Sequence, residues 1–242
     1  MSKPRFEDEF GGTYILIEPG LFSMGDLVGD GLARELPTHK VQIERPFFIG
    51  QRPVTQIHWE SVMGFNPSKF QEGWSSGLRP VDSISYVDCM EFINRLNQSF
   101  NKPQLSVDGI WRLPTEAEWE YCARSGTDTK WCFGNFDGDL DDYGWHAGNS
   151  GASTREVGLK KSNNWEIFDI YGLIAEWCLD NYRNDYTTPS KQSPYINDSD
   201  IYCVRGGSWF TESDSTRSSS RSHAKQDKTS DGIGLRLVWE PL

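Results

Sequence analysis

The stretch WRLPTEAEWEYCARSG, residues 111–126, carries signals for both ends of a helix. Thr115 and Glu118 have the spacing of a capping box, in which each side chain accepts a hydrogen bond from the other residue's backbone N–H. Gly126 stands where helices commonly end, because glycine adopts the left-handed conformation of that position without a steric penalty. The stretch therefore predicts a helix with both of its ends marked.

Apolar patterning predicts two further helices. The first lies in SISYVDCMEFINRLNQSF, residues 83–100, and its broad apolar face is formed by Val87, Met90, Phe92, Ile93 and Leu96. The second is shorter and lies in VTQIHWESVMG, residues 54–64, where Thr55 is a suitable N-cap and Gly64 a suitable end. Helices are therefore few, and only the two spanning residues 83–100 and 111–126 are main elements.

Strand signals surround these helices. TYILIEPGLFSMGD, residues 13–26, predicts two strands joined at a Pro-Gly turn, and residues 32–50 predict two more. GIGLRLVWE, residues 232–240, alternates and predicts a closing strand. Residues 127–166 are rich in Gly, Asp, Asn and Ser, so we expect a long loop ordered by ions, ligands or side-chain packing. Without a repeat or a linker, the chain is predicted to form a single α+β domain over residues 1–242.

Charge and cysteine content narrow the classes of function. The 242 residues carry a formal net charge of −11, which argues against nucleic acid or an anionic membrane as partner, because both need a basic face. Five cysteines occur, an odd number without a Cys-x-x-Cys pair, so no disulfide framework is expected. No leader or membrane-spanning run is recognised, and we expect a cytoplasmic protein, with a trimmed export signal left open.

Eight stretches point together to one family. In order along the chain they are FSMGD (22–26), ELPTHKVQI (35–43), RPVTQIHWE (52–60), RPVDSISYVDC (79–89), WRLPTEAEWEYCARSG (111–126), DIYGLIAEWCLDNY (169–182), VRGGSW (204–209) and GIGLRLV (232–238). Over nearly its whole length the sequence resembles the formylglycine-generating enzymes, the sulfatase-modifying-factor family. The resemblance implies that family's variant of the C-type-lectin fold, with short twisted sheets, two packed helices and much irregular loop.

The resemblance also implies a copper site, which this chain lacks the ligands to form. In the family, two cysteines five residues apart follow the Gly-Gly-Ser motif and bind copper for the oxidation of a substrate cysteine. Here those positions are Thr211 and Thr216, and no cysteine follows Cys203. A hydroxyl cannot replace a thiolate on Cu(I), so copper and formylglycine generation are not expected.

A calcium site is a further implication of the resemblance. Its ligands would be the carboxylates of Asp169 and Glu176 with the carbonyls of Gly172 and Ile174, since calcium prefers oxygen ligands. The alternative is that the two acidic residues only cap and brace a turn. Ala175 stands where the family has a tryptophan that faces the substrate groove, which weakens the case for the family's original substrate.

The segment after the Gly-Gly-Ser motif is the predicted ligand groove. The candidate residues are Ser208, Trp209, Phe210, Thr211, Glu212, Asp214, Thr216, Arg217, Arg221 and His223. Aromatic anchors among hydrogen-bonding side chains suit a peptide, protein or small-molecule ligand. The arginines, with Arg236 of the closing strand, would alternatively brace loops by bonding carbonyls and carboxylates.

We therefore expect a non-catalytic binding or regulatory module. The alternative is an oxidoreductase or other enzyme of the same fold that acts on a different small-molecule or peptide substrate, with Ser208, His223 and Arg217 among its acid–base and anion-binding groups. The fold resemblance alone does not separate these two functions. The oligomeric state is left open.

Overall fold

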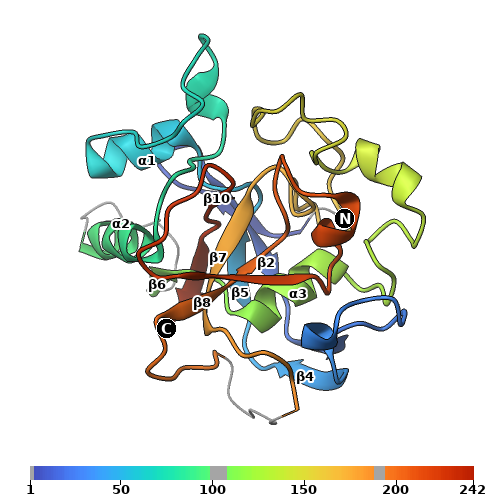
Figure 1. Ribbon diagram of the computed structural model, residues 1–242. Helices are drawn as coiled ribbons and strands as arrows, with labels where there is room; N and C mark the ends of the chain where they lie inside the picture. The colour runs from blue at the N-terminus through green and yellow to red at the C-terminus, as the bar shows by residue number, and fades with distance from the viewer. Residues whose placement is uncertain (1–2, 99–107, 188–193) are drawn as a thin grey trace.

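The computed structural model describes residues 3–98, 108–187 and 194–242, and it contains three α-helices and three sheets in those residues (Figure 1). The helices are α1 (Gln56–Met63), α2 (Tyr86–Gln98) and α3 (Glu116–Arg124). The short 3₁₀ helices are η1 (Ala33–Glu35), η2 (Ser76–Leu78), η3 (Asp137–Asp142) and η4 (Ser213–Thr216). Among the described residues, no helix is long and apolar enough to span a bilayer.

The largest sheet is antiparallel and joins both ends of the described chain. Its strand order is β1 (Arg5–Glu7), β2 (Thr13–Ile17), β5 (Phe47–Gly50), β11 (Val238–Pro241) and β6 (Gly109–Arg112). A second sheet has the order β10 (Ile233–Gly234), β7 (Ala175–Asn181), β8 (Ile201–Arg205) and β9 (Arg221–Lys225). The third sheet is the hairpin of β3 (Gly20–Met24) and β4 (His39–Ile43).

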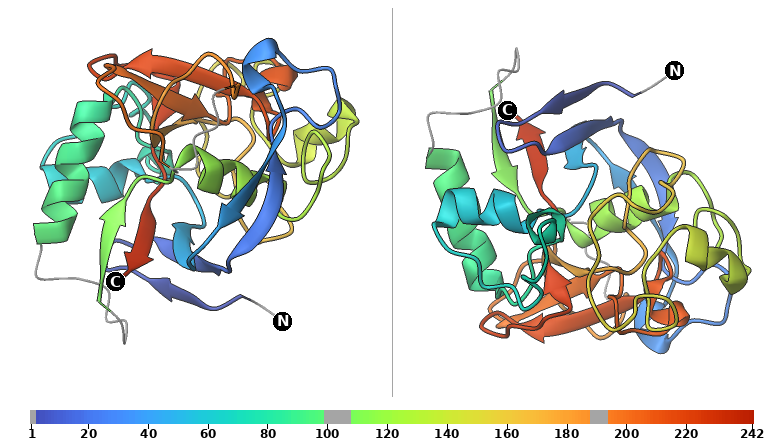
Figure 2. Two further views of the ribbon diagram at one scale, coloured as in Figure 1. Left: turned by 90° about the horizontal axis from the view of Figure 1, so that it is seen from below. Right: turned by 90° about the horizontal axis from the view of Figure 1, so that it is seen from above.

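Helix α3 lies between the two larger sheets, as both views of Figure 2 show. Its buried Trp119, Cys122 and Ala123 belong to one apolar cluster, which also contains Trp131 of the following loop. A second cluster joins α1 and α2 to the five-stranded sheet and is rich in tryptophan, including Trp59. The polar groups of the site are built on the framework that these two clusters fix.

The predicted helices form, with one correction to their faces. Thr55 and Gly64 cap α1 as expected, and both halves of the Thr115–Glu118 capping box are present in α3. In α2, however, Val87 is 53% exposed, and Met90 also faces solvent. The predicted apolar face is therefore too wide, because the second cluster covers only part of it. Residues 99 and 100 of the predicted helix lie outside the described residues.

The predicted closing strand is divided between two sheets. Its first part, β10, pairs in parallel with β7, and its second part, β11, pairs with β5 and β6. The alternating pattern could not reveal this change of sheet, since both halves are extended. Residues 127–166 form an irregular loop apart from η3, and stacked side chains order part of it, with Phe133 against both Trp131 and Tyr143.

Candidate functional site

The buried carboxylates of α3 hold the arginines of the four-stranded sheet. Arg221 of β9 binds Glu116 in a bidentate pair, with 2.6 Å between Nε and Oε1. Arg205 of β8 binds Glu120. Burial alone would raise the pKa of Glu116, but Arg221 and Arg205 outweigh that effect and lower it. These ion pairs fix the ends of β8 and β9, between which the predicted groove segment runs.

A Gly-Gly-Ser turn, residues 206–208, follows β8 directly. Gly206 and Gly207 have φ of 99° and 68°, in the left-handed region that favours glycine. A Cβ on Gly207 would lie 3.0 Å from the backbone oxygen of Ser215, so the turn also needs glycine for close approach. The N–H of Trp209 then donates to the carbonyl of Leu173, which holds the turn against the segment that precedes β7.

Thr211 and Thr216, at the positions of the family's copper ligands, use their hydroxyls in hydrogen bonds to the protein itself. The Thr211 hydroxyl accepts a hydrogen bond from the N–H of Ser208 at 2.9 Å. Thr216 is fully buried, and its hydroxyl accepts from Trp131 Nε1 at 3.0 Å and donates to the carbonyl of Ser213. The donor set does not fit copper, because both hydroxyls are hard ligands that already serve the loop.

The turn borders a cavity of about 190 Å³, here called the Ser208 cavity. It brings together four residues of the predicted groove, namely Ser208, Phe210, Thr211 and Arg221, with Ala175 of β7 on its wall. Ser208 is only 1% exposed, and its Oγ has no hydrogen-bond partner among the described residues. A buried hydroxyl without a partner is costly, so this oxygen is available to a ligand.

Trp209 lies beside the Ser208 cavity and not in its lining. Its ring packs edge-to-face against Phe210 and Phe70, with centroids 4.9 and 5.3 Å apart respectively. Its Nε1 donates to the carbonyl of Asp231 at 2.9 Å. Trp209 therefore supports Phe210, which does line the cavity and is 47% exposed.

Three other predicted groove residues are exposed and lie outside the cavity lining. They are Glu212, Asp214 and His223. The His223 ring stacks on Tyr182 with 4.2 Å between centroids. No histidine and no acidic residue lines the Ser208 cavity in the part of the chain that is described. The cavity therefore supplies hydroxyl and guanidinium groups but no ordinary general base.

The remaining arginines brace the loops, as the alternative interpretation proposed. Arg217 is buried in a bidentate pair with Glu35 of η1. Burial opposes ionisation of Glu35, but the hydrogen bonds of Arg217 outweigh it and lower the pKa of that carboxyl. Arg236 bonds both carboxylate oxygens of Glu176 and the carbonyl of Gly50.

The four candidate calcium ligands lie on one segment, but their oxygens differ in availability. Asp169 Oδ2 accepts the N–H of Gly158 at 2.6 Å, while Oδ1 is buried without a partner among the described residues. Burial raises the pKa of Asp169 to about 6. Glu176 is bound by Arg236 and also accepts from Trp119 Nε1. The carbonyl of Gly172 accepts from the N–H of Ile174 at 2.7 Å.

Arg34 is the charged residue of the Ser208 cavity lining that was not predicted from the sequence. It belongs to η1 and lies about 170 residues before the turn in the chain. Its Nε is buried and has no hydrogen-bond partner among the described residues. Its flanking sequence only suggested a strand, and no local signal marks a residue that tertiary packing carries to a distant loop.

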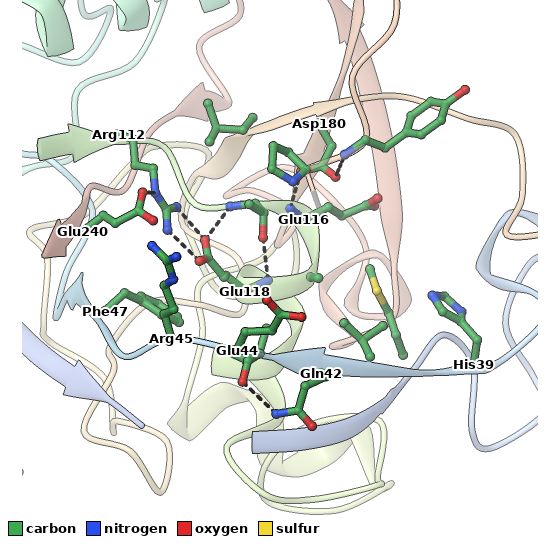
Figure 3. Close-up of a pocket in the computed structure, with 18 of the residues that line it drawn as sticks. His39, Gln42, Glu44, Arg45, Phe47, Arg112, Glu116, Glu118, Asp180 and Glu240 are labelled. Carbon is green, nitrogen blue, oxygen red and sulfur yellow. Dashed lines mark hydrogen bonds and ion pairs between the residues drawn. The ribbon is translucent and has the colours of Figure 1, made fainter. Parts of the chain in front are cut away.

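A second cavity, of about 680 Å³, lies between β4 and the start of α3 and is called the β4 cavity (Figure 3). In Figure 3, Arg112 bonds both Glu118 and Glu240. Asp180 accepts from the N–H of Glu116 at 2.7 Å, and burial raises its pKa to about 7. No unpartnered buried side-chain atom lines this cavity in the described ranges, so its buried charges form a satisfied scaffold.

The family model of the sulfatase-modifying factor enzyme 1-like domain matches residues 4–241 of the chain. The chain is 29% identical to the chaperone protein LppX of Paenibacillus barcinonensis over 175 residues, which cover 54% of this chain and 61% of LppX. It is 28% identical to the serine/threonine-protein kinase pkn1 of Chlamydia pneumoniae over 240 residues, which cover 93% of this chain and 37% of the kinase.

A third relative is the inactive C-alpha-formylglycine-generating enzyme 2 of Bos taurus, with 28% identity over 245 residues, 90% of this chain and 66% of that protein. The chain thus spans between 37% and 66% of the length of these three relatives.

Among solved structures, Treponema denticola variable protein 1 superposes with a TM-score of 0.85 at 28% identity, covering 99% of each chain. PvdO from Pseudomonas aeruginosa superposes equally well, with a TM-score of 0.85 at 22% identity and 99% of each chain covered, which shows a shared fold. The predicted fold class is confirmed.

Proposed function

Because the chain belongs to the family of the sulfatase-modifying factor enzyme 1-like domain, we propose that it is a non-catalytic member that binds a ligand in the Ser208 cavity. One observation carries the proposal. The cavity keeps a buried Ser208 hydroxyl that has no hydrogen-bond partner among the described residues, while the hydroxyls of Thr211 and Thr216 already bond within the loop. The site is thus built for contact with a ligand and lacks the thiolates that the family's oxidation uses.

The size of the cavity limits the ligand. Small-molecule pockets usually enclose about 300–1,000 Å³, and this cavity of about 190 Å³ is smaller. It suits a small molecule or a single anchoring side chain or terminus of a peptide. The partly exposed Phe210 at its wall supplies apolar contact area of the kind that anchors such ligands.

The test is a ligand-observed NMR screen of a small-fragment library on the wild-type protein, followed by the same screen on Phe210→Ala. We expect the cavity's fragments to lose binding in Phe210→Ala while its melting temperature stays close to wild type. The control is Phe136→Ala, since Phe136 is 68% exposed and does not line the cavity. Fragments that bind all three proteins equally, or no fragments at all, would contradict the proposal.

An enzyme with other chemistry is the second candidate function. It is favoured by the free Ser208 hydroxyl, which could act on a bound substrate. It has less support, because no histidine or carboxylate among the described residues lines the cavity to activate that hydroxyl. Turnover of any fragment during the screen, seen as new NMR signals that disappear in Ser208→Ala, would decide for this alternative.

We also propose calcium as a structural ion at Asp169. The buried Oδ1, which has no partner in the part of the chain that is described, supports a cation there, with the carbonyls of Gly172 and Ile174 as further oxygens. Glu176 would join this set only by leaving Arg236. Calcium should raise the melting temperature of the wild type but not of Asp169→Asn, and Asp142→Asn at an exposed site serves as control. A wild type that is insensitive to calcium after chelation would refute the site.

A further inference from the structure

We propose that Arg34 makes the Ser208 cavity selective for a carboxylate, so that its ligand is a small acid or a peptide terminus with a short apolar body. This inference rests on the proposed function and adds the chemistry of the ligand. It begins from an imbalance of charge. The protein carries a net charge of −11, yet no acidic residue lines this cavity in the described part of the chain, and two arginines do.

The two arginines differ in how their charge is used. Arg221 is saturated by the Glu116 carboxylate and by the carbonyls of Arg34 and Arg183. Arg34 forms no ion pair with any described residue, and its Nε is buried without a hydrogen-bond partner. Burying part of a guanidinium without a counter-charge is unfavourable, so the cavity gains when a ligand brings an anion.

The backbone of Arg34 is held in place from both sides. Its carbonyl accepts from Arg221 Nη1 at 2.7 Å. The next residue, Glu35, is fully buried and pairs with Arg217. The backbone of Arg34 is therefore held at the cavity by two ion-paired neighbours, so ligand binding requires no ordering of the main chain at this position.

The other residues that line the cavity favour a carboxylate over inorganic anions. A guanidinium matches the planar geometry of a carboxylate in a two-point contact, and the Ser208 hydroxyl can donate a further bond. Apolar walls are supplied by Val204, Phe210 and Ile233, while four further serines also line the cavity. Inorganic phosphate or sulfate would bury charged oxygens against these walls, whereas a monocarboxylate with an aliphatic or aromatic tail satisfies both sides.

The test uses the matched pair 3-phenylpropionate and 3-phenylpropanamide, with dissociation constants from NMR titration. We expect Arg34→Gln to weaken carboxylate binding roughly tenfold or more and to change amide binding far less, because only the carboxylate forms an ion pair with Arg34. Added salt should weaken the carboxylate alone. Arg45→Gln is the matched control, since Arg45 is exposed and lines the β4 cavity.

The outcomes separate this inference from the proposed function. Equal affinity of wild type and Arg34→Gln for the carboxylate, with binding of both probes lost in Phe210→Ala, overturns the role of Arg34 and keeps the cavity as a binding site. Failure of both probes to bind the wild type counts against both proposals. Arg34→Lys, which keeps the charge but not the two-point contact, should give an intermediate loss.

Two further probes distinguish the sources of the carboxylate. Acetylated glycyl-phenylalanine presents the same group as a peptide terminus, and inorganic phosphate tests a plain anion site. Tighter binding of the peptide than of 3-phenylpropionate would assign the cavity to a chain end, and the reverse order to a free acid. Phosphate binding that equals that of the carboxylate would overturn the selectivity proposed here.

Discussion

At the scale of single residues, the site depends on arginines that are buried with carboxylates. Arg236 and Glu176 illustrate this, since their side chains are 0% and 1% exposed and meet at 2.8 Å. Removing water from two charges is expensive, and the pair offsets that cost only while both partners are present. The residues around the Ser208 cavity are therefore positioned by ion pairs that tolerate no one-sided change.

We predict that Arg236→Gln lowers the free energy of unfolding by about 3–5 kcal/mol, because Glu176 is left as a buried charge with only the Trp119 bond. Urea unfolding followed by fluorescence measures the change. Lys161→Gln removes a partner of the exposed Lys161–Asp142 pair and should leave the transition where it is. An Arg236→Gln transition that coincides with wild type would contradict the role given to this pair.

At the scale of elements, α3 begins with a reciprocal cap, as α2 does with Ser85 and Asp88, whereas α1 does not. Thr115 Oγ1 accepts the N–H of Glu118 at 3.1 Å, and Glu118 Oε2 accepts the N–H of Thr115 at 2.9 Å. Helix α1 has only one such bond, from the N–H of His58 to Thr55 Oγ1 at 3.3 Å. The reciprocal cap fixes α3 at the point where its carboxylates must meet the arginines.

Thr115→Ala should therefore destabilise the protein by about 1–2 kcal/mol, and Thr55→Ala by about 0.5–1 kcal/mol. The same urea measurement on both variants tests the order of the two effects. The comparison is matched, since each variant removes one threonine hydroxyl from an N-cap. A larger loss from Thr55→Ala would show that the capping box of α3 contributes less than its geometry indicates.

At the scale of the whole molecule, the cysteines show that both apolar clusters exclude solvent from their thiols. All five are free and buried, four of them in the cluster around α3 and Cys89 in the other. Burial raises the pKa of each thiol, to about 11 for Cys132 and well above the usual thiol value for the other four. At neutral pH these groups are thus both protonated and shielded.

We predict that N-ethylmaleimide leaves the native protein unmodified and labels all five cysteines in urea, as counted by mass spectrometry. Glu72→Cys provides the control, because position 72 is exposed and its thiol should react at once. Rapid labelling of a native cysteine would show that one cluster opens under native conditions.

The sequence by itself determined the local structure. The capping box, the glycines of the Gly-Gly-Ser turn and the family motifs depend on residues close together in the chain, so helix positions, the turn and the fold class could be inferred. Four residues of the predicted groove do line the Ser208 cavity, and two of them, Ser208 and Phe210, lie in and just after the turn that the sequence marks.

Only the tertiary structure decided which side chains meet. In the structure, residues 232–240 are divided between two sheets, and Val87 is exposed. Glu212, Asp214 and His223 lie outside the cavity lining. The tertiary structure also brings Arg34 to the Ser208 cavity. Periodicity reports which face of an element is apolar, but contacts between residues about 170 positions apart follow from how the sheets pack around α3, and no local pattern records that packing.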